Sequence, residues 1–248
     1  EVEIDLGSKT ALTLNKCILD QIEKTSSGVS RWMNFEGVKY EAPCYLIKGV
    51  KVGNLSRKNA ISKQESRSFA DNGSILIQDP THQEAEKAGR MGRDFFSNKN
   101  LFLDCYRSIF FVCSNAKDLK NEHYKLERFV QTPLSITSDG IIIAIETDVG
   151  IKKFLLDTGA TISAIRNTNI EENISLLNNV PLYKNSKFII NGQDFGGRVL
   201  YLLDISPQFK DSDGILGMDF LHEHAVYLDF TRKIAYIGKS SEVFDPYE

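Results

Sequence analysis

The chain has 248 residues, of which 42% are hydrophobic and 25% are charged, and its net charge is −3 at pH 7. These values are typical of a folded globular protein, and a weak negative charge gives no reason to expect nucleic acid as a partner. The longest apolar runs, 109–113 and 141–145, are far too short to cross a bilayer, so we expect no membrane span. A chain of this length can hold two lobes of about 110 to 120 residues each.

The N-terminal part begins with a short strand that ends in a carboxylate. Val2–Ile4 is followed by Asp5-Leu6-Gly7-Ser8, where the glycine permits a sharp turn directly after the acidic side chain. A helix is predicted next, over 14–24, because apolar residues recur there with helical spacing.

All four cysteines lie in the first half of the chain, at Cys17, Cys44, Cys105 and Cys113. None has the Cys-x-x-Cys spacing of a structural zinc site, and no other metal-ligand pattern accompanies them. We therefore expect free thiols, no metal and no cofactor.

The second half contains a predicted β-hairpin that leads to a second carboxylate. Ile141–Thr147, the turn 148–150 and Ile151–Leu156 have the pattern of two strands joined by a tight turn. The second strand ends in the apolar run 154–156 and is followed by Asp157-Thr158-Gly159-Ala160. The pattern predicts that Asp157 is presented at the exit of a buried strand.

A second signature follows at 213–221, where Ile215-Leu216-Gly217 is followed by Met218-Asp219-Phe220-Leu221. With the Asp-Thr-Gly loop and this block in the same order, the chain resembles the aspartic proteases of the pepsin and retropepsin group. In that family, two apolar residues and a glycine support the Asp-Thr-Gly loop from below. The resemblance implies a retropepsin-like fold for the C-terminal half, with a short helix starting near Asp219.

The chain also matches itself at an offset of 125 residues. The segment 89–96 aligns without a gap on 214–221, and the register continues through Asp104 on Asp229 and Arg107 on Arg232. By the same comparison, the loop at Asp5 takes the place of a first Asp-Thr-Gly-Ala loop. The resemblance then implies the single-chain, bilobal form of the family.

The predicted fold is mainly β, with two homologous acid-protease-like β-barrel lobes in one chain and a few short helices. The first lobe is placed at 1–114 and the second at 129–248. The segment 115–128 is charged, has no strand pattern and is predicted to connect the lobes.

The resemblance implies a catalytic pair made of Asp5 and Asp157. Two carboxylates a few ångströms apart do not both ionise easily, so one holds a proton while the other stays charged. Such a pair can activate a water for attack on a peptide carbonyl without a metal or a covalent intermediate. The expected loop-supporting residues are Gly7, Met91, Gly92, Thr158, Gly159, Ile215, Leu216 and Gly217.

The first lobe carries 27 more residues than the second between its Asp loop and its supporting glycine. Matching 74–78 to 200–204 places the excess between Ser26 and Asn72. In bilobal members the first lobe supplies the flap that covers the substrate, so Trp32, Phe35 and Tyr40 are its candidate substrate-binding residues.

The first lobe also departs from the family pattern at two positions. Leu6 stands where the family has a hydroxyl residue that bonds across to the opposite loop. Arg90 stands where the supporting triplet has an apolar residue, and it must find a carboxylate or reach solvent.

Three functions are therefore open. The first is a monomeric aspartic endopeptidase that cleaves peptide or protein substrates with Asp5 and Asp157. The second is a homodimeric protease that uses Asp157 from two chains, and the third is an inactive protease-like module that binds peptides or a protein partner. The compartment stays open: we expect a soluble protein, and a secreted or periplasmic location after removal of an N-terminal segment is one alternative.

Overall fold

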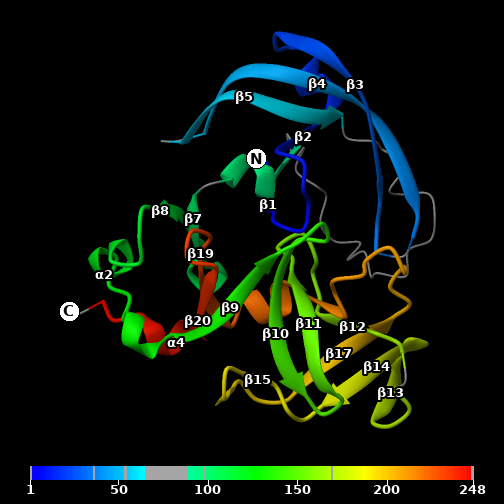
Figure 1. Ribbon diagram of the computed structural model, residues 1–248, viewed down its shortest axis with the longest axis vertical. Helices are drawn as coiled ribbons and strands as arrows, with labels where there is room; N and C mark the ends of the chain where they lie inside the picture. The colour runs from blue at the N-terminus through cyan, green and yellow to red at the C-terminus, as the bar shows by residue number, and fades with distance from the viewer. Residues whose placement is uncertain are drawn as a thin grey trace. The chain divides into compact units, whose positions relative to one another are not determined.

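The computed structural model describes residues 2–35, 37–52, 55–64, 89–97, 99–168 and 170–246 (Figure 1). The fold is mainly β, with only short helical turns. The chain divides into two compact units, Glu1–Phe95 and Phe96–Glu248, which are described separately.

The first unit contains a six-stranded sheet with the order β1-β6-β2-β5-β4-β3. Its strands are Val2–Asp5 (β1), Leu12–Leu14 (β2), Lys24–Met33 (β3), Lys39–Val52 (β4), Leu55–Gln64 (β5) and Gly89–Gly92 (β6). The helical turns are Lys16–Leu19 (α1) and Arg93–Phe96 (η2), the second of which reaches the boundary of the unit.

The predicted helix over 14–24 is wrong except for the single turn α1. Leu14 belongs to β2, and Lys24 begins β3, which pairs with β4 along a long hairpin. The residues after Lys24 are Thr25, Ser26 and Ser27, which are weak helix formers and gain more from pairing with a strand.

The second unit contains a 14-stranded sheet. Its main order is β13-β14-β17-β12-β18-β11-β10-β9-β20-β19-β7-β8, and β15 pairs with β10 and β16. The strands are Asn100–Asp104 (β7), Ile109–Cys113 (β8), Val130–Ile136 (β9), Ile141–Thr147 (β10), Gly150–Leu156 (β11), Ala164–Arg166 (β12), Ile174–Leu177 (β13), Val180–Asn185 (β14), Ile189–Ile190 (β15), Gln193–Asp194 (β16), Arg198–Leu203 (β17), Gly214–Leu216 (β18), His224–Asp229 (β19) and Ile234–Lys239 (β20).

The helical turns of the second unit are all short. They are Cys105–Arg107 (η3), Asp118–Asn121 (α2), Leu126–Arg128 (η4), Met218–Leu221 (α3) and Ser240–Val243 (α4). The helix expected after the supporting glycine is therefore present in α3, but it ends before His224, which begins β19.

The predicted hairpin before Asp157 is confirmed. β10 and β11 are antiparallel, with Ile142 opposite Leu155 and Thr147 opposite Gly150. Gly150 has φ +94, which suits the turn, and Phe154–Leu156 at the end of β11 are fully buried. Burial of this apolar run anchors the strand, so the residue that follows it is held in a fixed position.

The same strand order occurs once in each unit. In the first unit it is β1-β6-β2-β5-β4-β3, and in the second it is β11-β18-β12-β17-β14-β13. In both, the strand before the Asp loop is parallel to the strand of the supporting triplet, which is antiparallel to the strand after the loop. The predicted fold class, mainly β with two acid-protease-like lobes and few short helices, is confirmed.

The strand that completes the first sheet is not the one expected from the sequence. β5 pairs in parallel with β2, with Leu12 opposite Ser62, just as β17 pairs with β12 in the second unit. The segment 62–64 therefore takes the position expected for 74–78, and 74–78 itself lies outside the described residues.

The division between the compact units falls earlier than residue 114. β7 pairs with β19, so the hairpin β7–β8 belongs to the second unit (Figure 1).

The turns that follow β7 and β19 are built alike. Asp104 Oδ1 accepts from the Arg107 amide, and Asp229 Oδ1 accepts from the Arg232 amide. The residues after the two arginines, Ser108 and Lys233, both have φ +56.

The segment 115–128, predicted as a connector, packs against the second unit. Leu119 and Tyr124 are buried in a cluster that also contains Phe102 and Val243. The Tyr124 hydroxyl donates to the buried Asp104 at 2.9 Å. Burial and this contact raise the pKa of the Tyr124 hydroxyl above its ordinary range.

All four cysteines are free thiols. Cys44 and Cys113 are buried, whereas Cys17 is exposed and Cys105 is intermediate. Burial raises the pKa of Cys113 to about 12 and that of Cys105 to about 11, so both stay protonated thiols at neutral pH.

Candidate active site

The loop after β11 orients the Asp157 carboxylate by its own backbone. The Asp157 amide donates to Leu216 O at 3.0 Å, which ties the residue to β18. The amide of Gly159 donates to Asp157 Oδ1 at 2.8 Å, and the amide of Ala160 donates to Asp157 O at 3.3 Å. The carboxylate is thus held on a tight turn at the edge of a buried strand.

The supporting triplet closes this loop from the other side. Met218 and Asp219 donate from their amides to Ala160 O at 2.8 Å and to Thr161 O at 3.3 Å. A side chain at Gly217 would place its Cβ 2.5 Å from Ile162 O, so only glycine fits against the loop backbone. The backbone of the triplet, rather than its side chains, makes the contact.

The loop after β1 has the same construction in the first unit. The Ser8 amide donates to Asp5 Oδ1 at 2.9 Å and to Asp5 O at 3.2 Å. Arg93 and Asp94 donate from their amides to Ser8 O and Lys9 O, as Met218 and Asp219 do in the second unit. A Cβ at Gly92 would lie 2.2 Å from Thr10 O.

The side chains around the first loop differ from those around the second. Leu6 is fully buried, whereas its counterpart Thr158 is partly exposed. The Arg90 guanidinium lies 3.4 Å from a Glu3 carboxylate oxygen and 3.8 Å from Asp5 Oδ2. The expectation that Arg90 finds a carboxylate is therefore correct.

A further cation, Lys63, lies close to the first loop and had not been considered from the sequence. It is buried on β5, opposite Cys44 on β4 and Thr13 on β2. Burial lowers the pKa of its amine; Cys44 and Asp5 act to raise it, and Arg90 acts to lower it. Its amine also lies 4.0 Å from the centroid of the Trp32 ring.

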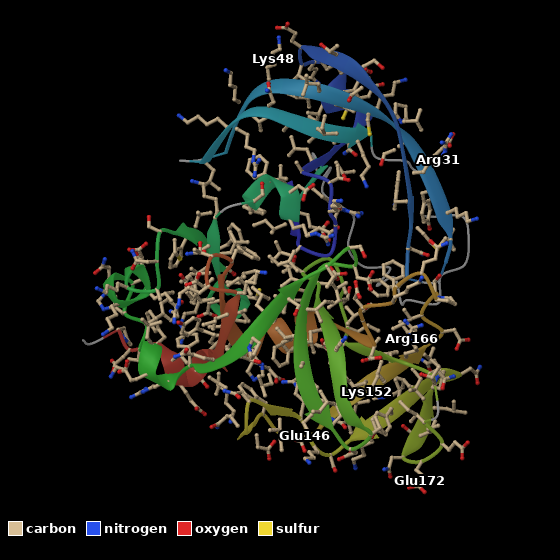
Figure 2. All side chains as sticks on the ribbon, viewed as in Figure 1. Arg31, Lys48, Glu146, Lys152, Arg166 and Glu172 are labelled. Carbon is tan, nitrogen blue, oxygen red and sulfur yellow. The ribbon has the colours of Figure 1, made fainter. Side chains whose placement is uncertain are left out.

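The flap candidates lie on the hairpin β3–β4 and its turn. Trp32 and Tyr40 are opposite each other on the two strands, and their rings stack with centroids 5.6 Å apart. Phe35 is in the turn, which is closed by the Val38 amide donating to Asn34 Oδ1 at 2.8 Å. The hairpin also carries charged residues, among them Arg31 on β3 and Lys48 on β4 (Figure 2).

The second loop has a buried polar support in the hydroxyl of Ser163. Ser163, which is fully buried, donates from Oγ to Asp219 Oδ1 at 2.6 Å and accepts from the Gly217 amide at 3.1 Å. The corresponding residue of the first unit is Ala11, whose carbonyl accepts from the Gly92 amide at 3.1 Å.

The structure thus gathers the predicted site residues within each unit. Asp5 and Gly7 lie with Met91 and Gly92, and 157–159 lie with 215–217. Lys63 escaped the sequence analysis because its position depends on the pairing of β5 with β2. The role of Ser163 was also missed, although its place six residues after Asp157 was visible.

The described residues contain no helix that is long and apolar enough to span a membrane. Within the same part of the chain, no three His, Cys, Asp or Glu residues are grouped as a metal site would require.

Comparisons with known proteins agree with this architecture. No protein-family model matches the chain, and no curated protein matches it. Among solved structures, the chain is similar to an aspartic proteinase from Irpex lacteus, with a TM-score of 0.56 and 16% sequence identity. The match covers 97% of this chain and 90% of that chain. The chain therefore shares the fold of a pepsin-like aspartic proteinase.

Proposed function

We propose that the protein is an aspartic endopeptidase that cleaves peptide or protein substrates as a monomer. Its catalytic pair consists of Asp5 from the first unit and Asp157 from the second. One observation carries the proposal: Asp5 ends β1 and Asp157 directly follows β11, the strand at the same sheet position, and each carboxylate accepts from an amide of its own loop, at 2.9 Å and 2.8 Å. The fold shared with an aspartic proteinase supports it.

In this proposal the two carboxylates meet around one water. The charged carboxylate takes a proton from the water as its oxygen bonds to the peptide carbonyl carbon, and the protonated carboxylic acid hydrogen-bonds the carbonyl oxygen. The carboxyl group that took the water's proton then gives it to the amide nitrogen as the C–N bond breaks, which releases a carboxylic acid and an amine, while the proton on the former carbonyl oxygen returns to the other carboxylate. The reaction consumes one water molecule and needs no other reactant.

The hairpin β3–β4 supplies the flap in this proposal. Trp32 and Tyr40 form an aromatic pair on adjacent strands, and Phe35 lies in the turn between them. Aromatic side chains there would cover the substrate and exclude water from the cleavage site.

Separate Asp5→Asn and Asp157→Asn variants test the proposal in a peptide-cleavage assay at acidic and neutral pH. Each should reduce kcat/KM by about 10²- to 10⁴-fold, because each removes one member of the acid–base pair. Asp194→Asn is the matched control, since Gly196 donates to Asp194 Oδ1 at 2.8 Å in a turn like that of Asp157, but on an exposed strand. It should keep full activity.

The charges at the first loop favour a second candidate, the homodimeric protease that uses Asp157 from two chains. Leu6 lacks a hydroxyl, and Asp5 is ion-paired with Arg90, so the first unit would be structural. Retention of activity by Asp5→Asn alone, together with a dimeric mass in solution, would favour this candidate. If the parent protein cleaves no peptide, the remaining candidate is the inactive protease-like module that binds peptides or a protein partner.

A further inference from the structure

Three charged residues lie around Asp5 at positions where the second unit has no acidic or basic residue. The register pairs Glu3 with Arg90 in the first unit and Leu155 with Ile215 in the second. Thr13 is opposite Arg90 and also opposite Lys63, whereas Ala164 is opposite Ile215 and also opposite Tyr201. The three counterparts are therefore Leu155, Ile215 and Tyr201, of which the first two are buried and none is an acidic or basic residue.

The contacts place both cations within electrostatic reach of the Asp5 carboxylate. Arg90 Nη1 is 3.8 Å from Asp5 Oδ2, and the Asp5 side chain is only 12% exposed. Lys63 interacts with the same carboxylate from β5. Other charged residues on the elements packed against Asp5 are Glu3 on β1, and Arg93 and Asp94 on η2. Arg93 donates to Gly7 O at 3.3 Å.

We propose that Arg90, assisted by Lys63, is a positioning residue that holds Asp5 as the charged member of the catalytic pair. Asp157 is then the member that carries the proton to the carbonyl oxygen. This inference rests on the proposed function and assigns the two roles that the aspartates alone leave open.

The physical reason is the low exposure of the site. A cation beside a partly buried carboxylate stabilises the charged form far more than the same cation in water. The water's proton therefore goes to Asp5 as the water oxygen bonds to the peptide carbon. The proton on Asp157 passes toward the carbonyl oxygen, so the total charge of the pair is unchanged.

A purely structural role for the Glu3–Arg90 pair is a weaker explanation. The second unit holds the same pair of parallel strands together with Leu155 and Ile215, and that solution leaves no charge to neutralise. Partly exposed ion pairs contribute little to stability, so the charges add little to what an apolar pair would give.

The experiment compares Arg90→Ile, Arg90→Lys and the double variant Glu3→Leu/Arg90→Ile, which copies the second unit. An internally quenched peptide that the parent cleaves gives kcat and KM from pH 3 to 8, and thermal unfolding reports the fold. In Arg90→Ile, the acid limb of kcat/KM should move up by about one pH unit, which is about a tenfold loss on that limb, with KM little changed. Arg90→Lys should restore the profile in large part.

The double variant separates positioning from stability. It should unfold at a temperature close to that of the parent and still show the displaced acid limb. A parental profile in this variant, or a higher kcat in Arg90→Ile, would overturn the inference while leaving the endopeptidase proposal intact. Cleavage that survives in Asp157→Asn would instead overturn the proposed function itself.

Discussion

The two Asp loops have nearly the same backbone and quite different surroundings. In both, an amide within the loop donates to the Asp carboxylate, and two amides after the supporting glycine donate to the loop carbonyls. Around Asp5, however, lie the charged side chains of Glu3, Arg90 and Lys63. The matching positions around Asp157 hold Leu155, Ile215 and Tyr201, none of which is an acidic or basic residue.

This difference shows which residues fix the loop and which are free to change. Backbone hydrogen bonds and glycines that leave no room for a Cβ hold the chain in place, so they recur. Side chains beside the carboxylate do not determine the backbone path. They set the electrostatic environment, and it is there that the two units diverge.

The strongest test of the shared backbone is Gly217→Ala. Its Cβ would lie 2.5 Å from Ile162 O and 2.8 Å from Ala160 O, and backbone atoms cannot move aside without opening the loop. We expect a loss of more than about 4 kcal/mol in the free energy of unfolding. Urea denaturation of the variant measures it.

Gly92→Ala should have a comparable effect in the first unit, since its Cβ would lie 2.2 Å from Thr10 O. Gly192→Ala is the control: it has φ +82 and no atom within 4 Å of the added Cβ, so it should cost only about 1 to 2 kcal/mol of backbone strain. Equal stability of the three alanine variants would contradict the role given to the supporting glycines.

A second test concerns His224, which is buried where the offset of 125 places the exposed Lys99. Burial lowers the pKa of His224 to about 4 from its ordinary 6.5, against the opposing effect of the bond from Nδ1–H to Phe220 O at 2.9 Å. As the pH falls, His224 therefore becomes protonated at a higher pH in the unfolded chain than in the folded chain.

The lowered pKa of His224 thus contributes to the free energy of unfolding. This contribution is complete above pH 6.5 and is lost as the pH falls from 6.5 to about 4. It amounts to about 3 kcal/mol at most. The loss of unfolding free energy between pH 7 and pH 4.5 should therefore be smaller in His224→Phe than in the parent. His222→Gln, at an exposed position, should behave as the parent does. Parallel losses in the parent and in His224→Phe would refute the assignment.

The buried hydroxyl of Ser163 predicts an intermediate effect for Ser163→Ala. The change leaves the Gly217 amide and Asp219 Oδ1 each without one buried partner. We expect a loss of about 2 kcal/mol. Ser186→Ala, which removes an exposed hydroxyl bond of 2.9 Å to Asp148, should change the stability by less than about 0.5 kcal/mol. If both variants lose the same amount, the buried pair is not a support.

The smallest expected effect is that of Lys63→Met, which replaces a buried amine by an apolar side chain of similar length. Because burial lowers the pKa of Lys63, the charged amine destabilises the folded state below the ordinary value of 10.5. The variant should be as stable as the parent or up to about 1 kcal/mol more stable at pH 7. That difference should shrink as the pH approaches 10.5, and a loss of stability at pH 7 would contradict the argument.

The sequence by itself determined the features that depend on neighbouring residues. The hairpin that ends at Leu156, the turn at Gly150 and the short helical turn after Gly217 were all predicted from local patterns. A strand's alternation, a glycine after a carboxylate and an apolar run are each visible within a few residues. The matching supporting segments were also visible, because they share one offset.

Only the tertiary structure decided which distant strands pair. It placed β5, rather than 74–78, beside β2, and so brought Lys63 close to Asp5. It paired β7 with β19 across more than a hundred residues of sequence. Such pairings depend on the burial of many side chains at once, because shifting a strand by one residue turns its buried face outward. A local sequence pattern does not report the combined burial of side chains that are distant in the sequence.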